Sequence, residues 1–163
     1  MNILKLKNEL TKIELVRDEL KALVVDHDNI IILGNGGSSS IASHISQDYT
    51  KVLKKNSFTF SDTSRLTCYI NDYGMENAYK IFLSEFSTKK TLVILISSSG
   101  NSENIINCAN FCCNEGIKYI TLTGFNKDNK LNKFTCYFNY WVDSKDYGIV
   151  ECAHLILLHS IIG

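Results

Sequence analysis

The chain has 163 residues, of which 45% are hydrophobic and 21% are charged, and these are ordinary values for one globular domain. Its 17 basic residues balance 17 acidic residues, which excludes a strong net field for nucleic acid or an anionic membrane. The longest apolar runs, such as Leu92 to Ile96, are far too short to span a bilayer, and no signal-peptide pattern is visible. These features predict a cytoplasmic protein with no nucleic-acid or membrane partner.

Residues 1–25 are predicted to form a helix, because Leu6, Leu10 and Ile13 recur at a spacing of three or four residues. Leu20 continues the same stripe. A lone helix of this length has no core of its own. It should therefore pack on the rest of the chain or on another subunit.

After this helix, apolar strands alternate with helices. The strand candidates are Asn29–Leu33, Phe58–Phe60, Leu66–Ile70, Thr91–Ile96, Lys118–Thr123 and Cys136–Val142. The helix candidates are Ser39 to about Leu53, Met75–Phe86, a segment from about Ser102 to Glu115 that Gly116 would stop, and Gly148–Ile162. Continuous apolar strands separated by helices predict a parallel sheet covered on both faces, in one domain over residues 1–163 with its α/β core at 29–162.

Two loops that directly follow strands have unusual chemistry. They are Gly34-Asn35-Gly36-Gly37-Ser38-Ser39-Ser40 and Ser97-Ser98-Ser99-Gly100-Asn101-Ser102. In an open parallel sheet, ligands bind beyond the carboxyl ends of the strands. Glycines let the backbone approach an anion, the next helix offers unpaired N–H groups, and serine hydroxyls add donors. Both loops together favour binding of a phosphate monoester.

These two loops can also be interpreted in other ways. Each loop alone could simply hold N-cap and turn serines. A dinucleotide fingerprint is disfavoured because its third glycine is replaced by Ser39, and no P-loop pattern is present. We therefore expect no nucleotide cofactor.

The six cysteines form neither a paired framework nor a C-x-x-C motif; they are Cys68, Cys108, Cys112, Cys113, Cys136 and Cys152. Several lie in apolar segments, which favours buried free thiols over a redox or metal role.

The chain resembles the SIS (sugar isomerase) family and, within it, the phosphoheptose isomerases. The resemblance rests on five stretches in order: Gly34 to Ser38, Asn71-Asp72-Tyr73-Gly74, Ser97 to Ser102, Leu122-Thr123-Gly124, and Glu151-x-x-His154 with His159. It implies a flavodoxin-like three-layer α/β/α sandwich with a five-stranded parallel sheet. It also implies a homotetramer or homodimer with active sites at subunit interfaces, in which the N-terminal helix is an assembly element.

The same resemblance implies site residues. The substrate-binding set is Asn35, Gly36, Gly37, Ser38, Asp72, Ser97, Ser98, Ser99, Ser102 and Glu151. Asp48 and His159 would be catalytic, and one zinc ion would be held by His44, Asp48, Glu151 and His159. His44 and Asp48 are four residues apart on one helix face, and from spacing alone they could be an ordinary surface pair.

Two positions depart from the family pattern, which has Glu at position 48 and Gln at position 151. Asp48 is one methylene shorter, so a base there would stand back by roughly 1 Å. Glu151 adds a negative charge, which should raise affinity for a dication. Of the other histidines, His154 is expected to be packed or at an interface, and His27 to lie at the surface.

The resemblance implies one function, and the residues leave two others open. The first is an aldose–ketose isomerase that converts sedoheptulose 7-phosphate to a heptose 7-phosphate through an enediol, for lipopolysaccharide or capsule synthesis. The second is a non-catalytic module that binds a phosphosugar or tethers a partner. The third is an isomerase of a different sugar phosphate, because the loop serines recognise the phosphate and not the carbon chain.

Overall fold

The computed structural model describes residues 3–162, so the first two residues of the predicted N-terminal helix and Gly163 lie outside the described part. Its helices are α1 (Ile3–Val25), α2 (Gly37–Lys51), α3 (Thr63–Tyr73), α4 (Met75–Phe86), α5 (Glu103–Glu115) and α6 (Tyr147–His159), with a short 3-10 turn at Leu131–Lys133. Its strands are β1 (Asn29–Gly34), β2 (Asn56–Thr59), β3 (Thr91–Ser97), β4 (Lys118–Thr123) and β5 (Phe138–Trp141). Among the helices described, none is both long enough and apolar enough to cross a membrane.

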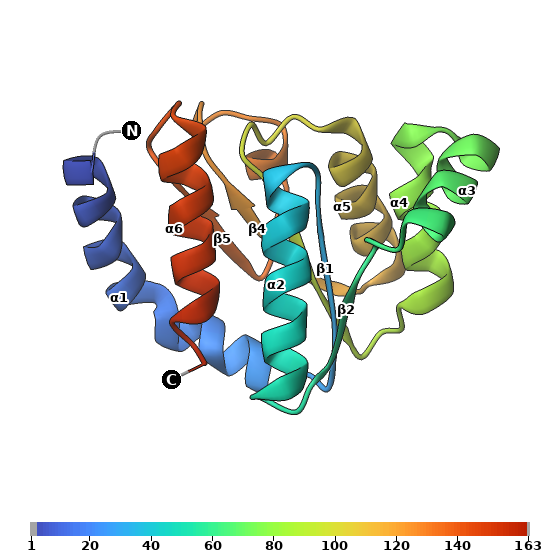
Figure 1. Ribbon diagram of the computed structural model, residues 1–163, viewed down its shortest axis with the longest axis horizontal. Coiled ribbons are helices and arrows are strands. Elements are labelled where there is room, and N and C mark those ends of the chain that lie inside the picture. The colour runs from blue at the N-terminus through green and yellow to red at the C-terminus, as the bar shows by residue number, and fades with distance from the viewer. Residues whose placement is uncertain (1–2, 163) are drawn as a thin grey trace.

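The strands form one parallel sheet in the order β2-β1-β3-β4-β5. This is the flavodoxin-like order, and helices cover both faces of the sheet, so the predicted fold class is confirmed. Figure 1 shows α2 and α6 across one face, with α1 beside α6, and α4 and α5 on the other side. The connection order reverses between β1 and β3. In such folds this switch point opens a crevice at the carboxyl ends of those two strands.

Alternating strand residues supply two cores. Ile30 and Ile32 of β1 face the α1, α2 and α6 side, whereas Ile31 and Leu33 face the α4 and α5 side. All four are fully buried, as a strand with helices on both faces requires. This explains why β1 and β3 are continuous apolar runs without a polar alternation.

One predicted strand is wrong. Leu66–Ile70 lies within α3, because Asp62 caps that helix by accepting a 2.8 Å hydrogen bond from the Arg65 amide. Leu66 and Ile70 then pack toward the core at helical spacing. A short apolar run fits either a strand or a helix, and the cap decides for the helix.

The other predicted elements are confirmed, with shifted ends. α2 begins at Gly37, two residues before the predicted start, and β2 begins at Asn56. β5 covers only Phe138–Trp141 of the longer predicted strand. Gly116 ends α5 in the left-handed conformation, with φ of 66°, as predicted.

Helix α1 docks on α6 through Ile13, Leu20 and Val24, which are buried. It also buries a carboxylate: Glu9 accepts a 3.0 Å hydrogen bond from the Tyr140 hydroxyl of β5 and lies 2.6 Å from the Lys12 ammonium. Burial together with the Glu9 charge raises the pKa of Tyr140 well above its ordinary value. The N-terminal helix is thus tied to this chain's own sheet.

Candidate functional site

The two serine loops meet at one hollow of about 250 Å³. The hollow lies where β1 and β3 run side by side and end, which is the switch point of the sheet. Its walls are Asn35, Gly36, Gly37, Ser38, Ile96, Ser97, Ser98, Ser99, Ser102, Tyr147 and Glu151. The loops that the sequence singled out therefore face a common space.

The first loop turns sharply from β1 into α2. Gly36 has a φ of 52°, a conformation that favours glycine, and its carbonyl accepts the amide of Ser40 at 3.1 Å. The Glu151 carboxylate lies against Gly37, so a side chain at that position would require the Glu151 side chain to move. The glycines thus let α6 approach the first turn of α2.

The serine hydroxyls of the second loop differ in their hydrogen bonding. Ser97 donates a 3.1 Å hydrogen bond to the Ser102 hydroxyl. The Ser98 hydroxyl is buried and has no hydrogen-bond partner among the described residues. Buried polar groups are nearly always paired, so this hydroxyl is free to hydrogen-bond to a group that enters the hollow.

Asn35 is held by a residue that the sequence analysis missed. Its side-chain amide exchanges two hydrogen bonds, of 2.9 and 2.8 Å, with the amide of Asn104 on α5. Asn104 is buried, and an asparagine on the apolar face of a predicted helix was the available signal. Half of the Asn35 hydrogen-bonding capacity is therefore used to join the two loops, and the other half is left for a ligand.

Helix α6 supplies the remaining wall. Glu151 is the one charged residue among the described residues of the lining, and its carboxylate makes no ion pair or hydrogen bond with any of the described residues. Tyr147, one helical turn earlier, was also missed by the sequence analysis, although its position four residues before Glu151 on a predicted helix places both on one face.

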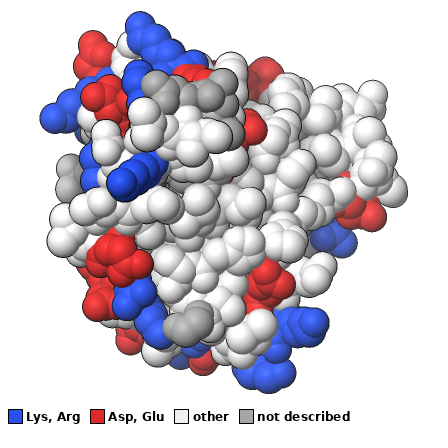
Figure 2. Space-filling model, turned by 60° about the vertical axis from the view of Figure 1, so that its left-hand side comes forward, with Lys and Arg blue, Asp and Glu red and all other residues white. Residues whose placement is uncertain are grey.

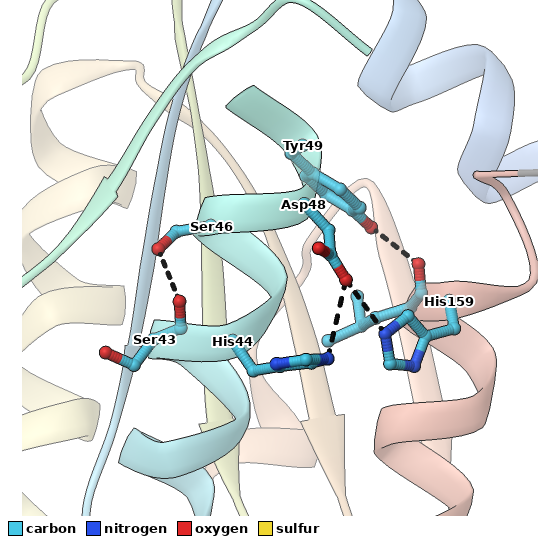
Figure 3. A network of polar contacts seen from close by, with 7 residues as sticks. Ser43, His44, Ser46, Asp48, Tyr49 and His159 are labelled. Atoms are coloured by element: carbon cyan, nitrogen blue, oxygen red, sulfur yellow. Dashed lines mark hydrogen bonds and ion pairs between the residues drawn. The ribbon is translucent and has the colours of Figure 1, made fainter. Parts of the chain in front are cut away.

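A second cluster lies further along α2 and α6. The His159 Nε2 atom is 3.1 Å from Asp48 Oδ2, and the His44 Nε2 atom is 3.4 Å from the same oxygen. Figure 3 shows both imidazole rings directed at the Asp48 carboxylate, one from each helix. The Tyr49 hydroxyl donates a 3.1 Å hydrogen bond to the Leu158 carbonyl and thereby joins the two helices beside the cluster.

The donor set of this cluster fits a metal ion. One ligand atom from each of His44, Asp48 and His159 lies within 4.8 Å of the others, and the two imidazole rings meet edge to face at 5.0 Å. Two imidazoles and one carboxylate with open space beside them are the ligands of many catalytic zinc sites. All three side chains are partly exposed, so an ion could reach them.

The predicted fourth ligand is not in this cluster. Glu151 precedes His159 by eight residues, which is about 12 Å along a helix axis, and its carboxylate lies against Gly37 in the serine hollow. The structure thus groups three of the four predicted ligands. Glu151 is too far along α6 from His159 to join the cluster, although both residues lie on similar sides of the helix axis.

Asp72 is also apart from the hollow. It lies near the end of α3, exposed, where it contacts the Asn71 amide at 2.9 Å and the Cys68 thiol at 3.5 Å. Because α3 packs on α4 at the far side of the sheet, the chain's own Asp72 does not line its own hollow.

The remaining histidines differ from one another. His154 is packed, as expected: its Nε2 donates a 3.0 Å hydrogen bond to the Thr123 carbonyl, and complete burial lowers its pKa to about 4. His27 was expected at the surface, and that prediction is wrong. It is buried, and its Nδ1 donates to the Leu23 carbonyl at 2.7 Å, which ends α1.

All six cysteines are free thiols, as predicted. Cys108 and Cys112 are buried, and burial raises the pKa of Cys112 to about 12. Cys68 and Cys113 are exposed, so not all of the thiols are core residues.

Comparison with known proteins agrees with this geometry. No protein-family model matches the chain. It is 34% identical to the phosphoheptose isomerase of Aliarcobacter butzleri, covering 82% of this chain and 73% of the relative. It is 29% identical to the phosphoheptose isomerase of Fusobacterium nucleatum, covering 96% and 82% of the two chains. In fold it matches phosphoheptose isomerase GmhA from Neisseria gonorrhoeae with a TM-score of 0.84 at 21% identity, over 98% of this chain and 92% of that one.

Proposed function

Because this chain belongs to the phosphoheptose isomerase family, an enzyme family of aldose–ketose isomerases, we propose that it converts sedoheptulose 7-phosphate to a heptose 7-phosphate. The observation that supports this most is the buried, unpaired hydroxyl of Ser98 in a hollow lined by four serines of one loop. A product of this kind would feed heptose synthesis for lipopolysaccharide or capsule. The six free thiols are in keeping with a cytoplasmic enzyme.

In this proposal the hollow binds the phosphate. Ser97, Ser98, Ser99 and Ser102 precede α5, and Ser38 lies in the first turn of α2. Both helix N-termini bring unpaired N–H groups and a positive dipole end to the same space. Neither Lys nor Arg is in the lining, so hydroxyls and amides would hold the dianion.

The cluster on α2 and α6 would carry the proton transfer. His159 Nε2 faces the Asp48 carboxylate at 3.1 Å, so an N–H there donates to Asp48 and leaves Nδ1 as the basic nitrogen. His159 Nδ1 would then move the proton between C1 and C2 of the sugar, and the Asp48 carboxylate, which contacts the imidazole directly, would hold the ring in that orientation. In the zinc-loaded protein, His44, Asp48 and His159 would instead hold the ion, which would replace the His159–Asp48 hydrogen bond and would supply Lewis acidity toward the substrate oxygens.

We also propose that the active site is completed by a second copy of the chain, in a homotetramer or homodimer. No residue of α3 is fully buried: Leu66, Tyr69 and Ile70 pack on the chain's own core but stay partly exposed, and Tyr73 is exposed. Helix α1 leaves Leu10 and Leu15 exposed. On the face in Figure 2, charges of both signs gather toward the margins and much of the middle carries neither. A partner covering such surfaces could bring its Asp72 to this chain's hollow.

A coupled assay with sedoheptulose 7-phosphate tests the function. We expect turnover by the zinc-loaded protein, less after EDTA, and a loss of about 100-fold or more in His159→Ala. His27→Gln, which changes a histidine outside both sites, is the matched control. Absence of turnover in the zinc-loaded protein would reject the proposal. A panel of five- and six-carbon sugar phosphates would then show whether the substrate is a different one.

The second candidate function is binding of a phosphosugar without turnover. The observation that favours it is that Asp48, a shorter residue than the family's Glu, has one oxygen contacted by both imidazoles. Calorimetric binding of the sugar phosphate without product formation would support this alternative.

A further inference from the structure

Tyr147 is an exposed aromatic residue at the rim of the serine hollow. Its side chain is 58% exposed, and it is the first residue of α6. Every other polar group of the lining is a hydroxyl, an amide or the Glu151 carboxylate, so Tyr147 is the one aromatic ring there. A large ring left in water at a polar hollow has apolar area that a ligand can cover.

The Tyr147 ring contacts a neighbour with a strained backbone. Phe125 packs edge to face against Tyr147, with ring centroids 4.8 Å apart. Phe125 has a φ of 56°, a left-handed conformation that is costly for a bulky residue and is typically retained near functional sites. Its amide donates a 2.9 Å hydrogen bond to the Ser144 carbonyl, which holds that conformation.

The same turn is tied to the second serine loop. The amide of Gly124, which precedes Phe125, donates a 3.0 Å hydrogen bond to the Ser98 carbonyl. On the other side, Asp146 caps α6 by accepting the Gly148 amide at 2.9 Å. Tyr147 is therefore held at a set position relative to the loop that contains the unpaired Ser98 hydroxyl.

A sugar phosphate has two kinds of surface besides its phosphate: hydroxyl groups and C–H groups. The hydroxyls can donate to Glu151, whose carboxylate is acceptor-only. The C–H groups need an apolar partner, and Tyr147 lies one turn before Glu151 on the same helix face.

We propose that Tyr147 is a specificity-determining residue whose ring packs against the C–H face of the sugar chain, while Phe125 acts as its positioning residue. This inference rests on the proposed function for the class of ligand, a polyhydroxy chain bearing a phosphate. It adds a residue that distinguishes such a chain from phosphate alone.

Calorimetry of the zinc-loaded protein tests this role with inorganic phosphate, glycerol phosphate and sedoheptulose 7-phosphate as probes. We expect Tyr147→Ala to weaken sedoheptulose 7-phosphate about tenfold and to leave inorganic phosphate within about twofold. Tyr147→Phe should keep wild-type affinity, because it retains the ring. In the assay, Tyr147→Ala should raise KM with little change in kcat.

Tyr137→Ala is the matched control, since Tyr137 is 57% exposed and lies outside the hollow. Unchanged affinity for the sugar phosphate in Tyr147→Ala would overturn the proposal. An equal loss of affinity for inorganic phosphate in Tyr147→Ala would also overturn it. The same holds if the wild-type protein binds sugar phosphate no more tightly than inorganic phosphate. Loss in Tyr147→Phe as well would assign the effect to the hydroxyl instead. Binding without turnover would reject the isomerase activity but not the stacking role.

Discussion

At the scale of single residues, the hollow is defined by groups whose bonding is incomplete. Ser97 is satisfied by Ser102, and Asn35 is half satisfied by Asn104, but the Ser98 hydroxyl has no partner among the described residues. A buried hydroxyl without a partner costs about 1–3 kcal/mol, so the folded chain retains it at the expense of stability. Such a cost is expected where a ligand later supplies the missing hydrogen bond.

Ser98→Ala should therefore separate binding from stability. We expect phosphate and sugar phosphate to bind about tenfold more weakly, because one donor is lost, whereas urea unfolding should show equal or higher stability. Ser57→Ala is the matched control, because the Ser57 hydroxyl is also buried and unpaired but lies outside the hollow. If Ser98→Ala bound phosphate as tightly as the wild type, the hydroxyl would not contact the ligand.

At the scale of elements, α6 is the organising helix. It contributes Tyr147 and Glu151 to the hollow, His159 to the candidate metal cluster, and His154 to the core. His154 joins α6 to the end of β4 through the Thr123 carbonyl, and its Nδ1 has no partner among the described residues. A neutral imidazole is thus buried between α6 and the sheet, midway between Glu151 in the hollow and His159 in the candidate metal cluster.

That imidazole should make stability depend on pH. Burial lowers the pKa of His154 from 6.5 to about 4, so between these pH values His154 is protonated in the unfolded chain and neutral in the folded chain. The contribution is therefore complete above pH 6.5 and is lost as the pH falls toward 4, by about 3 kcal/mol in all.

Urea unfolding between pH 7 and pH 4.5 would measure this dependence. His154→Leu should be less stable at pH 7, because the Thr123 carbonyl loses one of its two donors and keeps only the Val142 amide, but its stability should fall less steeply with acid. An unchanged slope in this variant would show that other groups cause the acid sensitivity.

At the scale of the whole molecule, the described chain holds most of the proposed site but not all of it. Helices α2 and α6 contribute to both the serine hollow and the His44, Asp48 and His159 cluster, whereas Asp72 is on α3 at the far side of the sheet. Exposed apolar residues such as Leu15 on α1 and Tyr73 on α3 are typical of an unpartnered interface. Assembly would therefore determine whether the sugar-binding residues come together.

Mixing two inactive variants would test that assembly. Asp72→Asn and His159→Ala subunits should each have little activity alone. If each site takes Asp72 from a partner subunit, about one site in four would contain both native residues after the subunits exchange, and activity should return. Light scattering would show the oligomer in parallel. If the mixture stayed inactive while each variant formed the wild-type oligomer, Asp72 would not act across the interface.

The sequence alone determined the parallel sheet, because continuous β-branched runs bounded by glycine and serine can be buried only between two helical layers. It also determined the two serine loops, since strand ends in such a sheet meet at one edge. Only the tertiary structure decided that Glu151 faces Gly37 and not the histidines, that Leu66–Ile70 is helical, and that Asn104 and Tyr147 belong to the hollow. These outcomes depend on which side chains approach from distant segments, and sequence spacing constrains only the residues of a single element.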